Sequence, residues 1–531
     1  MAASSPAPAS SPAYDTCPIP GTRPAGVPPP PARARQVLPH LALWAVLGLL
    51  WLVALRLPWL GDLGQHAAAV ERLRRDLSDP GGPLLARPGS DSPYYTPYTV
   101  VAALYARVTG AATLSVLSVC AAVNAVVLVA GVRAFVRTLT PRPWAPFLTF
   151  CCLGLLWGPE PFLWSGFLSL SGLCLSLSYP STFAFGLGLY VWARLDGAVR
   201  TGRGPVHWAG TGLLLGCVVL INPVVALGVL IGCAAVCAGA APGIGRRTLT
   251  GWAAGGAAAL LLVVLWPYGN VLSVQDASAL DFFHETAYHR KPLRYGLVCA
   301  ALPALLLRMR RSRRDPLVLL CAGALAVAAA GWFTGHYTWG RVLAFAVFAP
   351  QCALAVELAA PHPWAAVGPR TRRLVRAGVA AALCAGLWAQ SGALLYALPE
   401  LRKRPTLTRL VQFTPPWGKF GSLTRHLAYG DVVLTTHYKW LRVLPAYGVY
   451  TVAPAWPQPE IPRSEAAQRW NDTVRALSAR TGEGQRRAVL CRWQADWLIL
   501  TPAQPIPTGP EFRVIATGPD KARLVRVTFR C

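Results

Sequence analysis

Eleven apolar runs constrain this chain more than any other feature of its sequence. An α-helix needs roughly 20 residues to cross a bilayer, and runs of about that length lie at 38–57, 112–135, 144–158, 178–194, 207–221, 223–240, 250–268, 293–308, 316–334, 341–359 and 376–397. The chain is 54% hydrophobic, only 14% of its residues are charged, and its mean hydropathy is +0.41. We therefore expect a polytopic α-helical membrane protein with about eleven spans.

Arginine is concentrated in every second loop between these runs. The formal net charge of +28 would suit nucleic acid if the basic side chains gathered on one soluble surface. They stand instead in short loops, which is typical of the cytoplasmic side of a membrane protein. We therefore expect a multi-pass protein of the cell membrane with lipid and no nucleic acid as a partner, a cytoplasmic N-terminus and an extracytoplasmic C-terminus. The basic run 402–404 departs from this alternation.

The sequence divides into three parts. Residues 1–36 are rich in Pro, Ala and Ser and show no periodicity, so we expect a disordered cytoplasmic tail. Residues 37–400 hold the spans and one long exported loop, 58–97. Residues 401–531 are polar and mixed, which indicates a small extracytoplasmic α/β domain. Its expected elements are a helix near 464–479 and strands at 431–435, 449–452, 496–500, 512–516 and 523–527.

Two of the 14 cysteines, Cys491 and Cys531, lie in this C-terminal domain. We expect them to form a disulfide, because the exported side of a membrane permits oxidation. Most of the others lie inside apolar runs. They show neither a CxxC pair nor a Cys/His grouping of zinc spacing, and we interpret them as small buried side chains.

The exported loop holds the most informative polar residues. Asp62 and His66 follow the first span at i, i+4 spacing, which puts both side chains on one face of a helix. Asp62 has two interpretations, because its carboxylate can cap that helix or can serve an acid–base reaction. The amphipathic run 67–77 suits a helix that lies in the membrane interface.

This region resembles the GT-C superfamily of bacterial membrane glycosyltransferases, which use polyprenyl-phosphate sugars. An Asp early in the first exported loop, an interfacial helix and the segment SPYYTPYTVVAALYARVTG (92–110) carry the resemblance. YPSTFAFGLGLY (179–190), WPYGNV (266–271) and GRVLAFAVFAP (340–350) agree with it. It implies transfer of mannose or arabinofuranose from a polyprenyl-phosphate donor to a glycan, lipid or protein acceptor of the cell envelope, at the exported face.

The resemblance also assigns roles to residues. Asp62 is the expected base that takes the acceptor's proton, with His66 beside it. Many members have two adjacent acidic residues here, whereas Leu63 follows Asp62, so the sequence names no certain cofactor and leaves a divalent metal open. The expected contacts to the donor phosphate are Arg341, His336, Arg290 and Lys291. The expected substrate contacts are Tyr94, Tyr95, Glu160, Trp164, His284 and Glu285.

Other interpretations stay open. Arg341 can be an anchor at the head-group level, residues 281–291 can be a solvated loop, and Trp164 can belong to an interfacial aromatic belt. The alternatives for the whole protein are a transporter or flippase of lipid-linked sugars and a non-catalytic envelope-assembly protein. The spans contain few ionisable residues and no convincing repeat, which favours an enzyme over a transporter.

Overall fold

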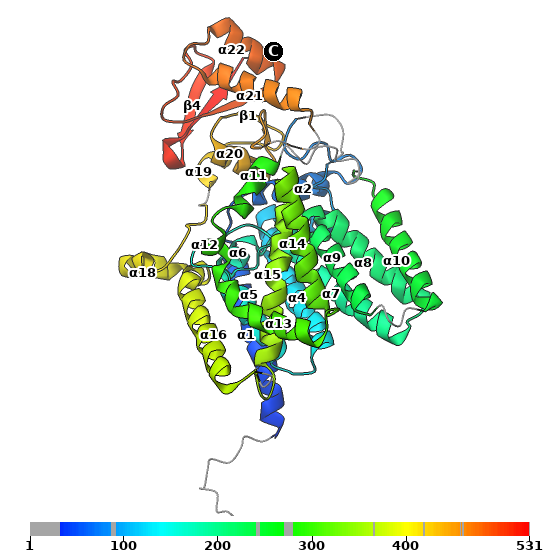
Figure 1. Ribbon diagram of the computed structural model, residues 1–531. Coiled ribbons are helices and arrows are strands. Elements are labelled where there is room, and N and C mark those ends of the chain that lie inside the picture. The colour runs from blue at the N-terminus through cyan, green and yellow to red at the C-terminus, as the bar shows by residue number, and fades with distance from the viewer. Residues whose placement is uncertain are drawn as a thin grey trace, which may run out of the picture.

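The computed structural model describes residues 32–86, 92–240, 245–269, 280–364, 367–417, 420–456, 458, 461–529 and 531. A bundle of helices carries the C-terminal domain at one end, and helix α1 (Ala32–Arg56) begins at the opposite end (Figure 1). Residues 1–31 of the expected tail lie outside the described residues. Residues 32–36 form the first turn of α1, so the helix starts before its apolar run.

Six stretches of the described chain are long and apolar enough to cross a membrane, or eight if two bent pairs are each one span. The six are α1, α4 (Thr113–Leu139), α10 (Arg246–Val264), the series α12 (Lys291–Tyr295), η5 (Gly296–Ala301) and α13 (Leu302–Arg311), then α14 (Pro316–Thr334), and η6 (Tyr337–Val342) with α15 (Leu343–Leu358). The bent pairs are α6 (Leu170–Ser176) with α7 (Pro180–Thr201), and α16 (Pro369–Ala389) with η7 (Ser391–Ala393) and α17 (Leu394–Ala397). Shorter apolar helices are α5 (Ala145–Leu155), α8 (Pro205–Ile221) and α9 (Pro223–Gly239).

Each of the eleven apolar runs contains one of these helices, which confirms the polytopic helical fold class. Helix α6 lies before the run 178–194, outside the predicted spans, and meets α7 at an angle of 114°. The backbone is extended at Tyr179, and Pro180 begins α7. Asn124 of α4 donates from Nδ2 to the carbonyls of Leu177 at 2.8 Å and Tyr179 at 3.1 Å. Such internal partners are what an irregular segment at membrane depth requires.

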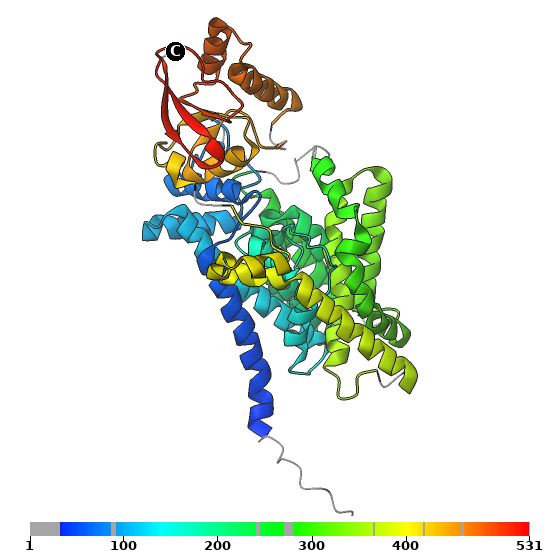
Figure 2. The same ribbon diagram turned by 90° about the vertical axis from the view of Figure 1, so that its left-hand side faces the viewer.

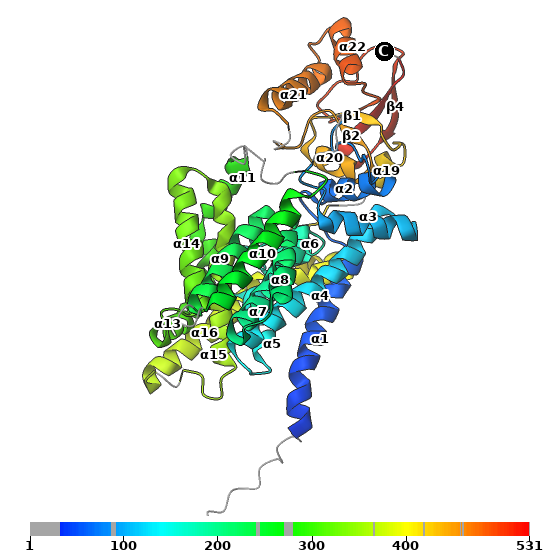
Figure 3. The same ribbon diagram turned by 90° about the vertical axis from the view of Figure 1, so that its right-hand side faces the viewer.

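Helix α2 (Leu63–Arg75) of the long loop and helix α3 (Pro97–Thr109), which follows the loop, lie between the bundle and the C-terminal domain (Figure 3). Helix α2 forms where the amphipathic run predicts one, but its expected contact with lipid is wrong. Almost every residue from Leu63 to Leu73 is buried, because α3 and the C-terminal domain cover the helix. Exposed apolar side chains are found on α3 instead, at Val101, Leu104, Tyr105 and Val108.

Short helical segments lie in two connections. α11 (Asp281–His284) and η4 (Glu285–Tyr288) precede α12 within the bundle, whereas η8 (Pro399–Lys403) and α18 (Pro405–Leu410) follow α17 and lead to the C-terminal domain. Helix α11 lies at the end of the bundle that faces the domain, and α18 projects sideways from the bundle (Figures 1 and 2).

The C-terminal domain is built on a mixed five-stranded sheet of order β2-β1-β3-β5-β4. Its strands are β1 (Val432–Leu434), β2 (Tyr450–Thr451), β3 (Trp497–Leu500), β4 (Phe512–Thr517) and β5 (Arg523–Val527), so a strand forms in each expected run. β1 is parallel to β2 and β3, and the other pairs are antiparallel. The helical elements are α19 (Gly421–Thr424), α20 (Tyr438–Val443), η9 (Leu444–Tyr447), α21 (Arg463–Leu477), α22 (Glu483–Arg492) and η10 (Pro519–Lys521).

The two faces of the sheet bury different neighbours. One face packs against α21 and α22, with Leu434, Leu477 and Leu490 in one apolar cluster. The other face shares a cluster with the membrane part of the chain, in which Val433 and Trp440 pack with Leu63. A continuous core therefore fixes the domain on the first turn of α2.

Arg72 of α2 reinforces this docking. It is 1% exposed, its guanidinium lies 4.5 Å from the ring centroid of Tyr429 and 3.6 Å from that of Tyr450, and it donates to the Gly448 carbonyl at 3.0 Å. Cation–π contacts of this kind are strongest when they are desolvated. The domain and the long loop therefore form one packed unit.

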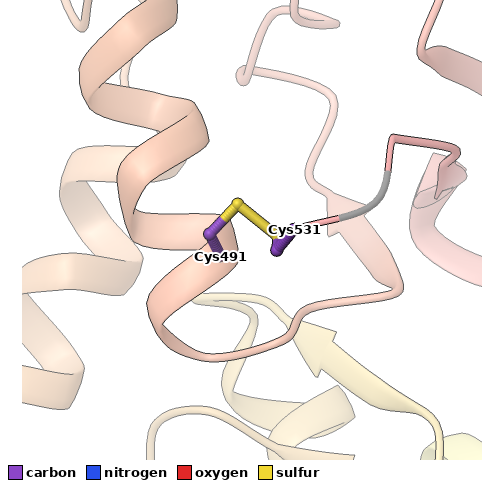
Figure 4. The surroundings of a disulfide bond; sticks show 2 residues. All are labelled: Cys491 and Cys531. Carbon is purple, nitrogen blue, oxygen red and sulfur yellow. A yellow bond between two sulfur atoms is a disulfide. The ribbon is translucent and has the colours of Figure 1, made fainter.

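A disulfide joins Cys491 of α22 to Cys531, as the sequence analysis expects (Figure 4). It links two positions 40 residues apart. The bond therefore ties the C-terminal residue of the chain to a helix that packs on the sheet.

Candidate active site

Asp62 occupies the turn between α1 and α2. Between the two helices, Leu57 and Gly61 have positive φ, and Asp62 is the N-cap residue of α2. Within the described part of the chain, its side chain makes no capping hydrogen bond. The Leu63 N–H donates to the Tyr179 hydroxyl at 3.0 Å, and the Gln65 N–H donates to the backbone carbonyl of Asp62 at 2.9 Å. The capping interpretation is therefore wrong, and the Asp62 carboxylate lies beside the Tyr179 hydroxyl.

His66 lies one turn further along α2, as the spacing predicts. Its Nε2 is 3.9 Å from Oδ2 of Asp62, and the exposed fractions of the two side chains are 14% for His66 and 37% for Asp62. The edges of Tyr94 and Tyr179 pack on the imidazole, with ring centroids at 5.4 and 5.5 Å. Burial lowers the pKa of His66, and the Asp62 carboxylate only partly opposes this effect. The imidazole is therefore neutral at neutral pH.

Arg341 of η6 lies within electrostatic reach of Asp62. It donates to the carbonyl of Ser165 and, at 3.3 Å, to its hydroxyl. Its guanidinium lies 5.1 Å from the ring centroid of Trp164 and 5.6 Å from that of Phe167. Among the described residues, no carboxylate lies within 4.0 Å of it. Arg341 therefore presents a positive charge that no adjacent acid neutralises.

His284 of α11 completes this group. Its ring packs edge-on against Trp164, with centroids 5.3 Å apart, and its Nδ1 lies 2.8 Å from the Leu280 carbonyl. Burial lowers the pKa of His284 to about 4, with a smaller contribution from the positive charge of Arg341, while Asp62 acts in the opposite direction. The structure thus brings together Asp62, Arg341 and His284, which lie far apart in the sequence.

Asp281 fixes the position of α11. Its Oδ1 accepts hydrogen bonds from the backbone N–H and the hydroxyl of Thr338, both at 2.7 Å. His336 lies next to it, with Nδ1 3.7 Å from Oδ2 of Asp281, and stacks on Trp339. His336 is half exposed and therefore lies on the rim of this region.

The remaining cations of the predicted phosphate site have partners of their own. Nη1 of Arg290 lies 3.0 Å from Oε2 of Glu160, and Nζ of Lys291 lies 5.5 Å from the ring centroid of Trp332. Glu285 lies 3.3 Å from His289. None of the contacts seen in the described chain joins these residues to Asp62, so their predicted roles in substrate binding stay predictions.

Tyr94 and Tyr95 have different surroundings. Tyr94 packs on His66, and its hydroxyl lies 2.5 Å from Oε1 of Gln65. Tyr95 is 1% exposed, and its hydroxyl donates to the Gly81 carbonyl at 2.6 Å. Tyr94 therefore borders the candidate site, while Tyr95 holds the fold of the loop.

Sequence reasoning missed two residues beside Asp62. Tyr179 holds both ends of the turn, because its hydroxyl donates to the Leu60 carbonyl and accepts from the Leu63 N–H. Arg442 of α20 reaches the same turn from the C-terminal domain, and a Cβ on Gly61 would lie 3.4 Å from its Nη2. The alternation of aromatic and basic residues in HYKWLR (437–442) is the one signal for Arg442.

The described residues contain no group of three or more His, Cys, Asp or Glu side chains that could hold a metal ion. The residues around Asp62 are cationic or aromatic. The arrangement is therefore suited to proton transfer and to binding an anion.

The fold resembles that of solved membrane proteins, although no protein-family model and no curated protein sequence matches the chain. ArnT from Cupriavidus metallidurans bound to undecaprenyl phosphate superposes with a TM-score of 0.53 at 14% identity, over 92% of this chain and 97% of that one. Its apo form gives 0.52 at 15% identity, over the same shares. This chain has the GT-C fold.

A second protein with the GT-C fold is larger. The arabinofuranosyltransferase AftD from mycobacteria superposes with a TM-score of 0.52 at 13% identity, over 93% of this chain but only 40% of the AftD chain. The superpositions confirm the fold that the resemblance implies, and they cover more than nine tenths of the length of this chain.

Proposed function

We propose that this chain is a glycosyltransferase that moves a sugar from a polyprenyl-phosphate donor to an acceptor of the cell envelope at the exported membrane face. One observation carries the proposal. The Asp62 carboxylate is partly exposed, makes no capping bond within the described chain and lies within electrostatic reach of Arg341. The solved proteins of the same fold include one bound to undecaprenyl phosphate and one arabinofuranosyltransferase, which supports the choice of donor.

The proposed reaction is a displacement at the anomeric carbon. The acceptor hydroxyl attacks this carbon, the bond from the carbon to the phosphate oxygen breaks, and Asp62 takes the hydroxyl proton. The electron pair leaves with the lipid phosphate, whose charge Arg341 stabilises. His66 and His284, both neutral because burial lowers their pKa values, donate or accept hydrogen bonds without adding charge.

The proposed orientation follows the arginine pattern of the loops. The end of the bundle that carries α2, α11 and the C-terminal domain then faces the exported side, and the start of α1 faces the cytoplasm (Figure 1). A lipid donor reaches Arg341 from the outer leaflet, and an acceptor approaches from the side of the C-terminal domain.

Asp62→Asn tests the proposed base. The substitution keeps the size of the side chain and removes its basicity, so we expect transfer to fall by about a hundredfold or more. Purified protein in lipid nanodiscs is given radiolabelled polyprenyl-phosphoryl mannose or polyprenyl-phosphoryl arabinofuranose with an envelope fraction, and labelled product is counted.

Asp79→Asn is the matched control, because Asp79 is an exposed acid of the same loop. It should leave the rate unchanged. Full transfer by the Asp62→Asn protein would exclude Asp62 as the base. Movement of intact donor across the membrane without transfer would favour a flippase.

A further inference from the structure

Arg442 extends the candidate site into the C-terminal domain. Helix α20 packs on the first turn of α2 so closely that a Cβ on Gly64 would collide with the Arg442 carbonyl. The Arg442 guanidinium lies against Gly61, the residue before Asp62. Its charge and that of Asp62 both act on the Tyr179 hydroxyl. Arg341 and Arg442 therefore approach the Asp62 turn from two different parts of the fold.

Aromatic rings surround the Arg442 guanidinium. Its Cζ lies 4.4 Å from the centroid of Trp456, 4.8 Å from that of Tyr438 and 5.4 Å from that of Trp417. Nη1 donates to the Tyr438 hydroxyl at 2.8 Å. All three rings keep part of their surface open to solvent. Rings and cation together thus form an accessible surface next to the candidate base.

The Arg442 guanidinium has no acidic partner, because no carboxylate lies within 4.0 Å of it among the residues that the structure describes. Arg72 is also enclosed by aromatic rings, but it is 1% exposed, whereas Arg442 is only half-buried. Arg72 is therefore part of the packing, and Arg442 is accessible to a ligand.

We propose that Arg442, Trp417 and Trp456 bind the acceptor and that this acceptor is a saccharide. The inference rests on the proposed function and adds the class of acceptor to it. The flat rings of Trp417 and Trp456 suit the apolar face of a sugar, and a guanidinium donates to hydroxyl and ring oxygens in a fixed geometry. Asp62 follows Gly61, against which Arg442 lies, and is within electrostatic reach of Arg341, so a hydroxyl held at Arg442 can lose its proton to Asp62.

The first test measures binding without turnover. Asp62→Asn protein is titrated in equilibrium dialysis with labelled α-1,6-mannobiose and α-1,5-arabinofuranobiose. We expect one of the two to bind, and Arg442→Gln to weaken its binding about tenfold to a hundredfold, the effect of one lost charged hydrogen bond. Trp456→Ala should weaken it by a similar factor, while Arg442→Lys should recover part of the loss.

Arg425→Gln is the control, because Arg425 is an exposed arginine of the same domain. It should bind the disaccharide as the parent does. Unfolding temperatures of all variants show whether each protein is folded. The proposal is wrong if neither disaccharide binds. It is also wrong if folded Arg442→Gln binds the disaccharide as tightly as the parent protein does.

The second test separates this inference from the proposed function. In the transfer assay, Arg442→Gln should raise the acceptor KM more than tenfold and change the donor KM by less than about threefold. If the parent protein transfers sugar and the acceptor KM of Arg442→Gln is unchanged, the proposed acceptor site is wrong but the proposed glycosyltransferase activity is supported. If a disaccharide binds and its binding depends on Arg442, but no sugar is transferred from any donor, the saccharide site is supported and the proposed transferase activity is wrong.

Discussion

Replacing Arg341 by Gln should weaken the donor's binding far more than replacing Arg290 by Gln. The sequence analysis assigns both residues to the donor phosphate, but the structure gives them different surroundings. Arg290 lies 3.0 Å from Glu160, and its side chain is 60% exposed. Arg341 lies among Trp164, Phe167 and Ser165, and among the described residues no carboxylate is within 4.0 Å of it.

The size of the effect follows from these contacts. A hydrogen bond from a guanidinium to a phosphate is worth about 1.5 to 3 kcal/mol, which corresponds to roughly a tenfold to a 150-fold rise in the donor KM for Arg341→Gln. Arg290 is paired with Glu160 and largely exposed, so a contact from it to the donor would be solvated and worth about 0 to 1 kcal/mol, like other exposed ion pairs. Arg290→Gln should therefore change the donor KM by no more than about fivefold.

The assay varies polyprenyl-phosphoryl sugar at a saturating acceptor concentration and compares donor KM values for the parent and the two variants. Arg341→Lys is a third variant, because it keeps the charge but loses the planar guanidinium group. Its donor KM should lie between those of the parent and of Arg341→Gln. Thermal unfolding of each protein shows whether the loss of the Ser165 bonds has disturbed the fold. Equal shifts for Arg341→Gln and Arg290→Gln, or no shift in either, would refute the assignment.

Two further predictions concern stability. Burial lowers the pKa of His284 from 6.5 to about 4, so the unfolded chain binds a proton below pH 6.5 that the folded chain does not, and the unfolding temperature should fall between pH 6.5 and 4. His284→Gln should reduce this fall, and an equal fall in both proteins would contradict the burial of the ring. Cys491→Ser should destabilise the C-terminal domain by about 2 to 4 kcal/mol, seen as faster trypsin cleavage of the domain. Cys384→Ser changes an exposed free cysteine, and trypsin should cleave this control at the same rate as the parent. Equal cleavage rates for Cys491→Ser and the parent would show that the disulfide adds no stability.

The membrane part of the fold was readable from the sequence because a span needs a long apolar run whatever its neighbours are. Each apolar run contains a helix, and each expected β-rich run of the C-terminal domain contains a strand. The run 178–194 was placed after the break, so α6 was not predicted, and neither was the 114° angle that α6 makes with α7. It depends on Asn124 of α4, whose amide binds the carbonyls of Leu177 and Tyr179, and no local pattern predicts such a tertiary contact.

The surroundings of α2 show the same limit. Its amphipathic pattern predicts a helix with one apolar face, and this prediction is confirmed. A pattern does not say what covers an apolar face, and lipid was the wrong choice. The cover is a domain more than 300 residues later in the chain, held partly by Arg72 against Tyr429 and Tyr450.

The sequence predicts the parts of the candidate site whose geometry follows from the spacing of residues along one helix. It does not predict the parts that depend on contacts between distant segments. Asp62 and His66 share a helical face because they are four residues apart. The absence of a capping bond, by contrast, follows from the folded backbone, in which the Gln65 N–H donates to the Asp62 carbonyl and the Leu63 N–H to the Tyr179 hydroxyl. Arg442 comes to the Asp62 turn only because the domain docks there.

The docking of the C-terminal domain links these observations. A carboxylate at the start of a helix is normally drawn to the free N–H groups of the first turn, and it is then a poor base. Here Tyr179 binds the Leu63 N–H, and the segment that carries Tyr179 is fixed by Asn124. The same turn is covered by α20, which places the Arg442 guanidinium against Gly61. The Asp62 side chain thus makes no capping bond among the described residues and lies within electrostatic reach of Arg341, so a negative charge that develops near the carboxylate has a counter-charge.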